Sequence, residues 1–232
     1  MLILFDIDGT LVPGRPEAHQ DALVRALVEV YGIEVRDGEN PIQDAEPWGK
    51  TDRQIVRDVL RPRGLSDAEI DARLEPFERL ACELHSAARE PRLTGEAREG
   101  AAAALEELRE AGHRLALLTG NYEPIARQKM ELCGLAGFFL AGQGAFGSDS
   151  ERRPELVPIA RRRAGPNGRP HARSDTLLVG DTPLDVAAAH ADGVRCVAIT
   201  GRRFGRAELL AGKADAVIDD LAEVPALASE LG

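Results

Sequence analysis

The sequence predicts an α/β protein: a Rossmann-like, three-layer core with a parallel sheet, interrupted by an inserted all-helical cap. Three features of the 232 residues predict this. A short apolar run opens the chain, a purely helical pattern follows it, and strand-like runs then alternate with helical stretches. We therefore expect residues 1–13 and 92–232 to form the core and residues 14–91 to form the cap, each of ordinary domain size.

The first predicted strand is Met1–Phe5, whose five residues are all apolar. A continuous apolar run of this length is typical of a parallel strand that is buried on both faces. Asp6 ends the run, Asp8 follows two residues later, and Gly9 permits a sharp turn. Two carboxylates are thus expected at the edge of the sheet where open α/β folds bind their ligands.

A helical region is predicted after the breaker cluster 13–16, whose sequence is Pro-Gly-Arg-Pro. Apolar residues keep helical spacing in two segments between 23 and 60, and a third segment begins at Ser66. Glu69, three residues later, completes a capping-box pattern for that helix. Pro76 lies inside the third segment and predicts a kink there, or a break between two helices.

The second half alternates between helical patterns and short strand-like runs, which is typical of a parallel sheet with crossover helices. The predicted helices are 96–111, 124–133, 154–164 and 183–192. The predicted strands are 114–119, a short one near 138–141, 176–180, 194–199 and one around 215–218. Right-handed crossovers bring the carboxyl ends of such strands to one edge of the sheet.

Polar residues stand at the ends of several predicted strands or at the start of the next helix. Thr119 and Gly120 end one strand, Arg153 opens a helix, Asp181 follows another strand, and Asp185 comes four residues later. Because the strand ends share one edge, we expect these residues to meet the two carboxylates that follow the first strand.

This set of residues suits phosphoryl transfer assisted by a divalent cation. Carboxylates ligate hard cations such as Mg²⁺, and a carboxylate also accepts a phosphoryl group, which divides the transfer into two easier steps. A hydroxyl, backbone amides at Gly120 and a fixed positive charge can hold the phosphoryl oxygens. A second carboxylate near the nucleophile can serve the leaving oxygen. For the first motif by itself, an ordinary surface turn remains the alternative.

The ordered motifs resemble those of the haloacid dehalogenase-like superfamily, whose members are mostly Mg-dependent phosphatases. The matching pieces are Asp6-x-Asp8-Gly9-Thr10, Thr119, the basic residue near Arg153, and Gly180-Asp181-x-x-x-Asp185. The resemblance implies Asp6 as the nucleophile and Asp8 as the general acid, then as the base for the hydrolytic water. It implies that Thr119 and Arg153, with Gly120 beside them, bind the transferred phosphoryl group.

The resemblance also implies a magnesium site. Asp6 and Asp181 would hold the ion, with Asp8 next to them and Asp185 supporting the site. Mg²⁺ is accordingly the expected cofactor.

At one position the chain departs from the family pattern, because Lys is usual where this chain has Arg152-Arg153-Pro154. We expect Arg153 to take the role, since Pro154 suits the first helical turn and fixes the residue just before it. Arginine keeps the charge but presents a planar fork in place of a compact ammonium. An ordinary solvated basic cluster is the alternative.

The predicted function is that of a Mg-dependent phosphatase, which hydrolyses a small phosphate monoester through an aspartyl-phosphate intermediate. Within the superfamily the chain is most similar to phosphoglycolate phosphatase-like members. A sugar-phosphate mutase, β-phosphoglucomutase-like, is the alternative, in which the phosphoenzyme transfers to a second hydroxyl. A non-enzymatic aspartyl-phosphate switch is a remote alternative, since receiver domains use acid clusters on a similar sheet.

Trp48, Lys50 and Arg53 in the predicted cap are the candidate residues for substrate specificity. Lys50 or Arg53 can pair with a substrate carboxylate, a hypothesis from charge and position. A cap lysine can also form a Schiff base with a carbonyl substrate, as in phosphonate-cleaving relatives. Those relatives lack the second aspartate, which this chain has as Asp8, so an anion-binding loop is favoured.

Composition restricts the partners. The net charge of −10 argues against nucleic acid and anionic membranes, and the expected partner is a small phosphorylated metabolite. The chain has no span of about 20 apolar residues and no secretory leader pattern. Its three cysteines are widely spaced, as in proteins of a reducing compartment, so a cytoplasmic location is expected. A monomer and a homodimer are both compatible with the sequence.

Overall fold

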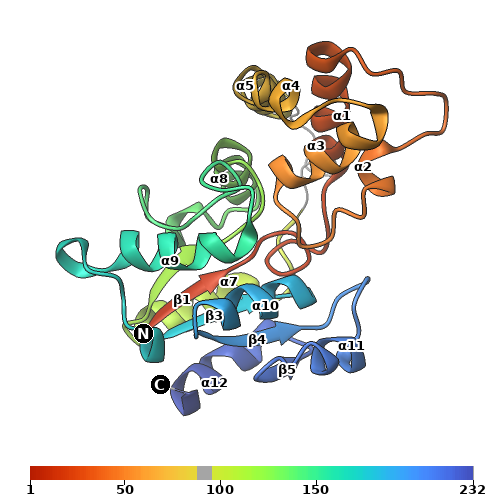
Figure 1. Ribbon diagram of the computed structural model, residues 1–232. Coiled ribbons are helices and arrows are strands. Elements are labelled where there is room, and N and C mark those ends of the chain that lie inside the picture. Colours follow the sequence, from red (N-terminus) through yellow and green to blue (C-terminus); the bar gives the residue numbers. More distant parts are fainter. Residues whose placement is uncertain (88–95, 232) are drawn as a thin grey trace.

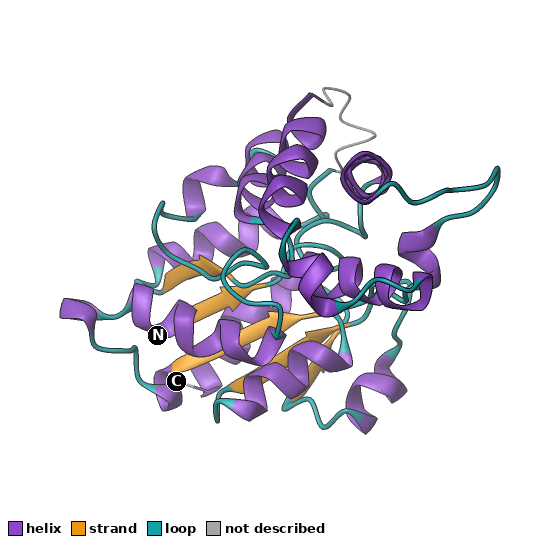
Figure 2. Cartoon of the chain, turned by 45° about the horizontal axis from the view of Figure 1, so that its top comes forward, coloured by secondary structure: helices purple, strands orange, loops and turns teal. Residues whose placement is uncertain are grey.

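The computed structural model describes residues 1–87 and 96–231, which form a core with a central sheet and a helical cap beside it (Figure 1). The predicted fold class is confirmed. The strands are parallel, and helices lie on both faces of the sheet (Figure 2). The predicted boundary between cap and core at residues 91 and 92 lies outside the described residues.

The sheet has the strand order β2-β1-β3-β4-β5. The strands are β1 (Leu2–Phe5), β2 (Arg114–Leu117), β3 (Thr176–Gly180), β4 (Arg195–Ile199) and β5 (Ala216–Ile218). Phe5 at the end of β1 lies opposite Leu117 of β2 and Val179 of β3. The strand order therefore reverses direction at β1, and the residues that follow these three strands share the crevice where doubly wound sheets bind ligands.

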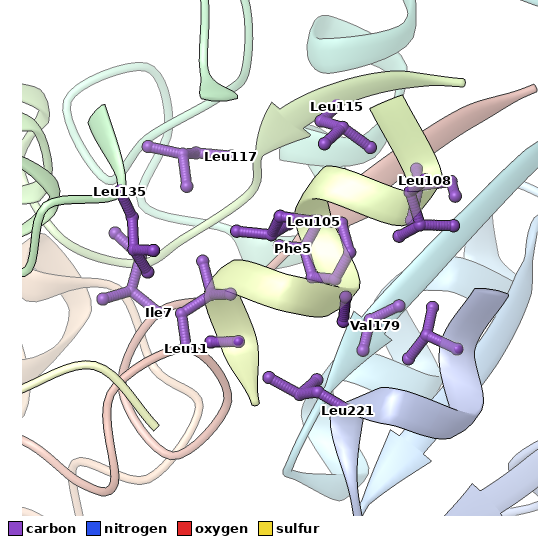
Figure 3. Close-up of a cluster of buried hydrophobic side chains, with 14 of the residues drawn as sticks. Phe5, Ile7, Leu11, Leu105, Leu108, Leu115, Leu117, Leu135, Val179 and Leu221 are labelled. Carbon is purple, nitrogen blue, oxygen red and sulfur yellow. The ribbon is translucent and has the colours of Figure 1, made fainter. Parts of the chain in front are cut away.

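Each face of the sheet has its own apolar core, because side chains alternate between faces along every strand. Phe5 and Val179 belong to one face, where Leu105 and Leu108 of α7 pack against them (Figure 3). The helices that contribute to this face are α7 (Ala101–Glu110), α8 (Glu123–Leu132) and α12 (Val224–Leu231). The opposite face is covered by α9 (Arg153–Ala164), α10 (Pro183–Ala191) and α11 (Arg206–Ala211).

The cap helices are α1 (Glu17–Tyr31), α2 (Pro41–Asp44), α3 (Asp52–Leu60), α4 (Asp67–Asp71) and α5 (Leu74–Ala87). They enclose a third apolar core, which also takes in Tyr122 and Ile125 of the core domain. The predicted capping box forms, with the Ser66 N–H donating to Glu69 Oε2 at 2.9 Å. In the described ranges, no helix combines the length and the hydropathy needed to cross a membrane.

The structure differs from the predicted elements at two places and agrees with them at a third. The predicted strand near 138–141 is wrong, because Ala136–Phe138 form a 3₁₀ turn. Phe139 lies in the loop that follows, and its buried ring packs edge-on against Phe5. The predicted break between two helices in the third cap segment is confirmed; it precedes Pro76, which lies in the first turn of α5 where its missing N–H costs nothing. The predicted helix 96–111 begins five residues later, after Gly100 in the left-handed region.

Further short elements lie in the described ranges. The remaining 3₁₀ turns are Arg61–Arg63, Pro166–Gly168, Arg173–Asp175 and Leu221–Glu223. Helices α11 and α12 were not predicted, because α11 has six residues and α12 eight, which is too short for a clear helical period.

The substitution Leu178→Ala tests the burial of strand β3 in the centre of the sheet. Leu178 is fully buried in β3, so the cavity left by the substitution is expected to lower the free energy of unfolding by about 2–5 kcal/mol. Leu140→Ala is the matched control, because Leu140 is 62% exposed and should change it by less than about 0.5 kcal/mol. Urea unfolding of both variants measures the difference, and equal midpoints would contradict the packing of β3.

Candidate active site

Three buried carboxylates converge at the carboxyl edge of the sheet. Asp6 directly follows β1, Asp181 directly follows β3, and Asp185 lies in the first turn of α10. One oxygen of each lies within 4.8 Å of the others, and the residues are 4%, 7% and 0% exposed. The Thr182 N–H donates to Asp185 Oδ2 at 3.0 Å in a capping box, which fixes the orientation of that carboxylate.

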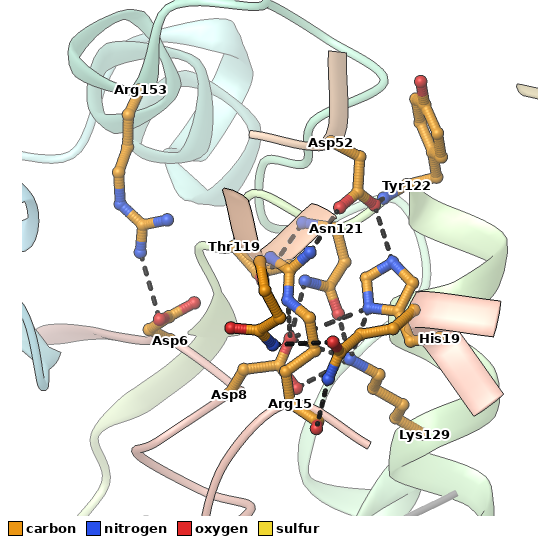
Figure 4. A network of polar contacts seen from close by, with 12 residues as sticks. Asp6, Asp8, Arg15, His19, Asp52, Thr119, Asn121, Tyr122, Lys129 and Arg153 are labelled. Carbon is orange, nitrogen blue, oxygen red and sulfur yellow. Dashed lines mark hydrogen bonds and ion pairs between the residues drawn. The ribbon is translucent and has the colours of Figure 1, made fainter. Parts of the chain in front are cut away.

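Arg153 is the cation in direct contact with this group. It is the first residue of α9, and its Nη2 lies 3.1 Å from Asp6 Oδ2 (Figure 4). Its Nε donates to Asp185 Oδ1 at 3.1 Å. The neighbouring Arg152 has a side chain that is 76% exposed and pairs with Glu155. The structure thus brings Arg153, and not Arg152, to the carboxylates.

The carboxylates carry more negative charge than Arg153 offsets. Burial raises the pKa of Asp6 to about 6, with Asp185 and Asp8 adding repulsion and Arg153 opposing. Burial and the neighbouring Asp185 and Asp6 also raise the pKa of Asp181 well above its usual range. Asp181 Oδ1 is buried and has no hydrogen-bond partner among the described residues. Oxygen donors with excess negative charge and an unsatisfied oxygen are what a divalent cation requires, so these residues can hold one.

A glycine makes the approach of Asp181 possible. Gly9 has a φ of +96°, and a Cβ placed there would overlap the Asp181 carboxylate. The turn after Asp8 therefore leaves room for Asp181 only with a residue that has no side chain.

Thr119 and Gly120 follow β2 at the same edge. Thr119 is fully buried, and its Oγ1 accepts a hydrogen bond from the Asn121 N–H at 3.3 Å. The Gly120 carbonyl accepts from the Asp52 N–H of the cap at 2.8 Å, and a Cβ on Gly120 would overlap the Lys50 carbonyl. The cap therefore docks against the backbone at Gly120.

A cavity of about 840 Å³ lies between cap and core. The predicted residues that line it are Asp6, Asp8, Trp48, Lys50, Thr119, Gly120, Arg153 and Asp181. Asp185 stands behind Arg153, to which it is ion-paired. This arrangement places the carboxylates, the hydroxyl and the guanidinium on one chamber that is large enough for a small metabolite.

The three cap residues that are predicted to determine substrate specificity lie in different surroundings. Lys50 Nζ donates to Asp58 Oδ2 at 2.8 Å and to the Ala45 carbonyl at 2.7 Å, so its charge is already paired within the cap. Arg53 donates to Glu78 at 2.9 Å and lines a separate hollow that includes Cys82. Trp48 lines the main cavity.

The Asp8 carboxylate is held by a buried lysine. Lys129 Nζ of α8 lies 2.6 and 2.8 Å from the two oxygens of Asp8, and Asn121 Nδ2 donates to Asp8 at 2.9 Å (Figure 4). Lys129 is itself fully buried and also donates to Asn121 Oδ1 at 2.6 Å. The side chain of Asp8 is thus oriented toward α8, beside the group formed by the other three carboxylates.

Cap residues complete this network. Lys129 Nζ lies 3.1 Å from Nδ1 of His19, and Nε2 of His19 lies 3.0 Å from Asp52 Oδ2. Arg15 donates to Asp52 Oδ1 at 3.4 Å. Cap and core therefore share one buried set of charges, in addition to their apolar contact.

The network sets the charge of its members. Burial by itself would raise the pKa of Asp8, but Lys129, Arg15 and His19 outweigh it and hold the pKa well below its usual range. Burial lowers the pKa of His19 to about 4, with Lys129 and Arg15 adding to the effect and Asp52 opposing it. His19 is therefore neutral at pH 7; with Nδ1 accepting from Lys129, its proton is assigned to Nε2, which faces Asp52.

The sequence-based prediction missed this network: Arg15, His19, Asp52, Asn121 and Lys129. A signal was present for one of them. Lys129 lies on the buried face of α8 with Ile125, Ala126 and Met130, and the chain has lysine at only two other positions. A charged residue at helical spacing with apolar ones indicates a buried ionic partner.

Comparison with known proteins agrees with the geometry. A family model described as haloacid dehalogenase-like hydrolase matches residues 1–193. A phosphoglycolate phosphatase of Cereibacter sphaeroides is 31% identical over 204 residues, covering 85% of this chain and 84% of its own. A plasmid-encoded phosphoglycolate phosphatase of Cupriavidus necator is 31% identical over 228 residues, covering 97% and 91%.

Solved structures share the fold over nearly the whole chain. CbbY from Rhodobacter sphaeroides, in complex with phosphate, superposes with a TM-score of 0.64 at 21% identity, covering 96% of this chain and 95% of its own. A candidate β-phosphoglucomutase from Bacteroides vulgatus superposes with a TM-score of 0.65 at 19% identity, covering 99% and 88%.

Lys129→Met tests the buried network. The substitution leaves Asp8 without its main counter-charge and Asn121 without a donor, so we expect a loss of about 3–5 kcal/mol in the free energy of unfolding. The loss should be similar from neutral pH down to about pH 4 and shrink only below that, because the lowered pKa of Asp8 keeps its carboxylate ionised in the folded chain until the pH falls beneath the ordinary value of 3.8. Urea unfolding at several pH values measures it. Lys213→Met, at an exposed lysine, is the control, and equal losses in both variants would contradict the ion pair.

Proposed function

Because the chain belongs to the haloacid dehalogenase-like hydrolases and its relatives indicate a phosphatase, we propose that it is a magnesium-dependent phosphatase of small phosphate monoesters. The observation that carries the proposal is the group of Asp6, Asp181 and Asp185 with Arg153, beside Thr119 in one cavity. The substrate that we propose is phosphoglycolate or a close analogue, since phosphoglycolate phosphatases are 31% identical over most of the chain.

The carboxylate group fits magnesium. Asp6 and Asp181 present oxygens to one point, Asp185 closes the group, and the unsatisfied Oδ1 of Asp181 lacks a positive partner among the described residues. Mg²⁺ prefers oxygen ligands, and when bound it neutralises phosphoryl oxygens and orients the attack. The side chain of Asp8, expected near the ion, instead reaches toward Lys129. Asp6, Asp181 and Asp185 are therefore the side chains that we propose for the site.

In the first proposed step, an Asp6 oxygen attacks phosphorus and the bond from phosphorus to the ester oxygen breaks. The leaving oxygen takes a proton from Asp8, while Arg153 and Thr119 hold the phosphoryl oxygens. In the second step, water attacks the aspartyl-phosphate and gives its proton to Asp8. Inorganic phosphate leaves, and the Asp6 carboxylate is restored.

The two roles of Asp8 require different protonation states. The ionised carboxylate beside Lys129 is the form that the second step needs. The first step needs it protonated, and the negative charge of an incoming phosphate ester raises its pKa toward that form. The neighbouring cations and the substrate thus act on Asp8 in opposite directions.

Further parts of the proposal concern the contact with the leaving group, the alternative reaction and the location of the enzyme. Trp48 is the cap residue proposed to contact the leaving group, because it lines the cavity. The β-phosphoglucomutase-like alternative stays a prediction, since a likeness at 19% identity carries the fold and not the reaction. We propose a cytoplasmic enzyme acting on small phosphorylated metabolites as a monomer or homodimer.

Asp6→Asn tests the nucleophile. The amide cannot form the acyl-phosphate, so turnover should fall by more than about a thousandfold while the fold is retained. Initial rates with Mg²⁺ on phosphoglycolate, glucose 1-phosphate and p-nitrophenyl phosphate measure the activity, and phosphoglycolate should give the highest kcat/KM in the wild type. Asp37→Asn, at an exposed carboxylate, is the control. Formation of glucose 6-phosphate would instead identify a mutase, and substantial residual hydrolysis by the variant would exclude Asp6.

Magnesium affinity should depend on pH in a defined direction. In the metal-free fold, burial raises the pKa of Asp6 from its ordinary 3.8 to about 6, so the carboxyl group keeps its proton up to about pH 6. Asp6 therefore favours folding at low pH, and this contribution is lost as the pH rises through 6. Mg²⁺ needs the ionised form, so its affinity should be strongest above about pH 7 and weaken by up to about tenfold per unit below 6.

Isothermal titration calorimetry with Mg²⁺ at pH 5, 6 and 8 measures this dependence without any turnover. The Asp6→Asn variant is the reference, because it lacks the titrating carboxylate. Equal wild-type affinities at pH 5 and pH 8 would contradict a protonated Asp6 in the metal-free protein.

A further inference from the structure

The segment 147–152 connects the docked cap to Arg153, and Glu151 is the point of contact. The Glu151 carbonyl accepts a hydrogen bond from Thr51 Oγ1 at 2.7 Å. Its two carboxylate oxygens accept from Arg57 Nε at 2.7 and 2.9 Å. Thr51 is the N-cap of α3, and Arg57 lies within the same helix. One cap helix therefore donates hydrogen bonds to both the backbone and the side chain of Glu151.

Arg57 is held rigidly on the cap side. It is 8% exposed, and its remaining nitrogens donate to Asp67 at 3.0 Å and to Asp71 at 2.6 Å, both on α4. A guanidinium that meets three carboxylates through different nitrogens has a fixed plane and direction. Arg57 therefore presents its Nε to Glu151 in one orientation for as long as α3 and α4 keep their places.

The core holds the segment only at its other end. Asp149 accepts from Arg163 at 2.6 and 2.7 Å and from the Phe146 N–H at 2.9 Å. Beyond it, the hydrogen bonds and ion pairs of the Ser150 and Arg152 side chains stay within residues 150–155. In the described part of the chain, Glu151 is thus where the stretch between Asp149 and Arg153 is tied to a distant element.

The start of α9 depends on this tie. The N-cap position of α9 is Arg152, and among the described residues no side chain caps the helix there. Helix ends without a cap fray unless other contacts fix them. Glu151 is two residues before Arg153, so the chain between them spans no more than about 7 Å. Fixing Glu151 therefore restricts the first turn of α9, in addition to the contacts that Arg153 makes with Asp6 and Asp185.

We propose that Thr51, Arg57 and Glu151 form a clasp through which docking of the cap positions Arg153 for the phosphoryl group. Arg57 and Glu151 are positioning residues, because they bind each other and cap residues, and they act through Arg153. The same docking brings the Asp52 N–H to the Gly120 carbonyl. The segments of Gly120 and Arg153, both proposed to bind the phosphoryl group, are therefore positioned together when the cap docks. This inference rests on the proposed role of Arg153 in binding phosphate.

A double-mutant cycle tests the clasp. Glu151→Gln should lower kcat by about tenfold and leave KM within about twofold. The reason is that a misaligned Arg153 binds the phosphoryl group less well in the transition state. In an Arg153→Ala background the same substitution should change kcat by less than about twofold, since the group through which it acts is gone. Equal effects of Glu151→Gln in both backgrounds would overturn the proposal.

The control is Glu39→Gln. Glu39 pairs with Arg63 on the cap, and its side chain is 27% exposed against 29% for Glu151, but this pair does not involve the segment before Arg153. Glu39→Gln should leave kcat unchanged. Arg57→Lys keeps the charge and loses the fork, and it should resemble Glu151→Gln; thermal unfolding of each variant shows whether the cap stays folded.

Hydrogen–deuterium exchange of the metal-free protein separates this inference from the proposed function. Peptides that cover 150–157 should exchange faster in Glu151→Gln and Arg57→Lys than in the wild type or Glu39→Gln. If the wild type has no phosphatase activity, the proposed function is refuted. The exchange measurement still tests the clasp in that case, because it does not depend on turnover. Unchanged exchange over 150–157 in both clasp variants would overturn the inference.

Discussion

The grouping of three buried carboxylates around one guanidinium is the constraint on which the site depends. Asp6, Asp181 and Asp185 repel one another, and Arg153 offsets only part of their charge. Neighbouring features make the grouping possible: a residue without a side chain at Gly9, and a capping box that turns Asp185 inward. Such an arrangement lowers the stability of the metal-free fold and raises its affinity for a cation, which is how binding sites commonly trade stability for function.

A second charge cluster lies on the other side of Asp8, and it belongs to cap and core together. Lys129 compensates Asp8, while neutral His19 connects this pair to Asp52. The hydrogen bond between Lys129 and His19 crosses from core to cap, so this contact exists only with the cap docked. The loop that carries Asp6 and Asp8 therefore faces a site deficient in positive charge on one side and a compensated network on the other.

The fold and part of the site could be predicted because they depend on local signals. Short apolar runs fix buried strands, and topology then brings Asp6 and Asp181 to one edge. The strand predicted near 138–141 was wrong because Phe139 is apolar for packing against Phe5 and not for pairing in the sheet. The partners of Asp8 lie up to 121 residues away, and no spacing rule joins them.

The cap closes the cavity mainly by close approach of backbones. Gly120 allows the Lys50 carbonyl to come near, and a Cβ on Gly49 would overlap Thr182, the residue that caps the helix carrying Asp185. Both glycines lie beside the proposed phosphoryl-binding end, so side chains there would hold the cap away and admit water. The charge of Lys50 is meanwhile paired with Asp58. Docking at this end is therefore governed by shape, while the ion pair of Glu151 with Arg57 and the hydrogen bond between Lys129 and His19 connect cap and core elsewhere.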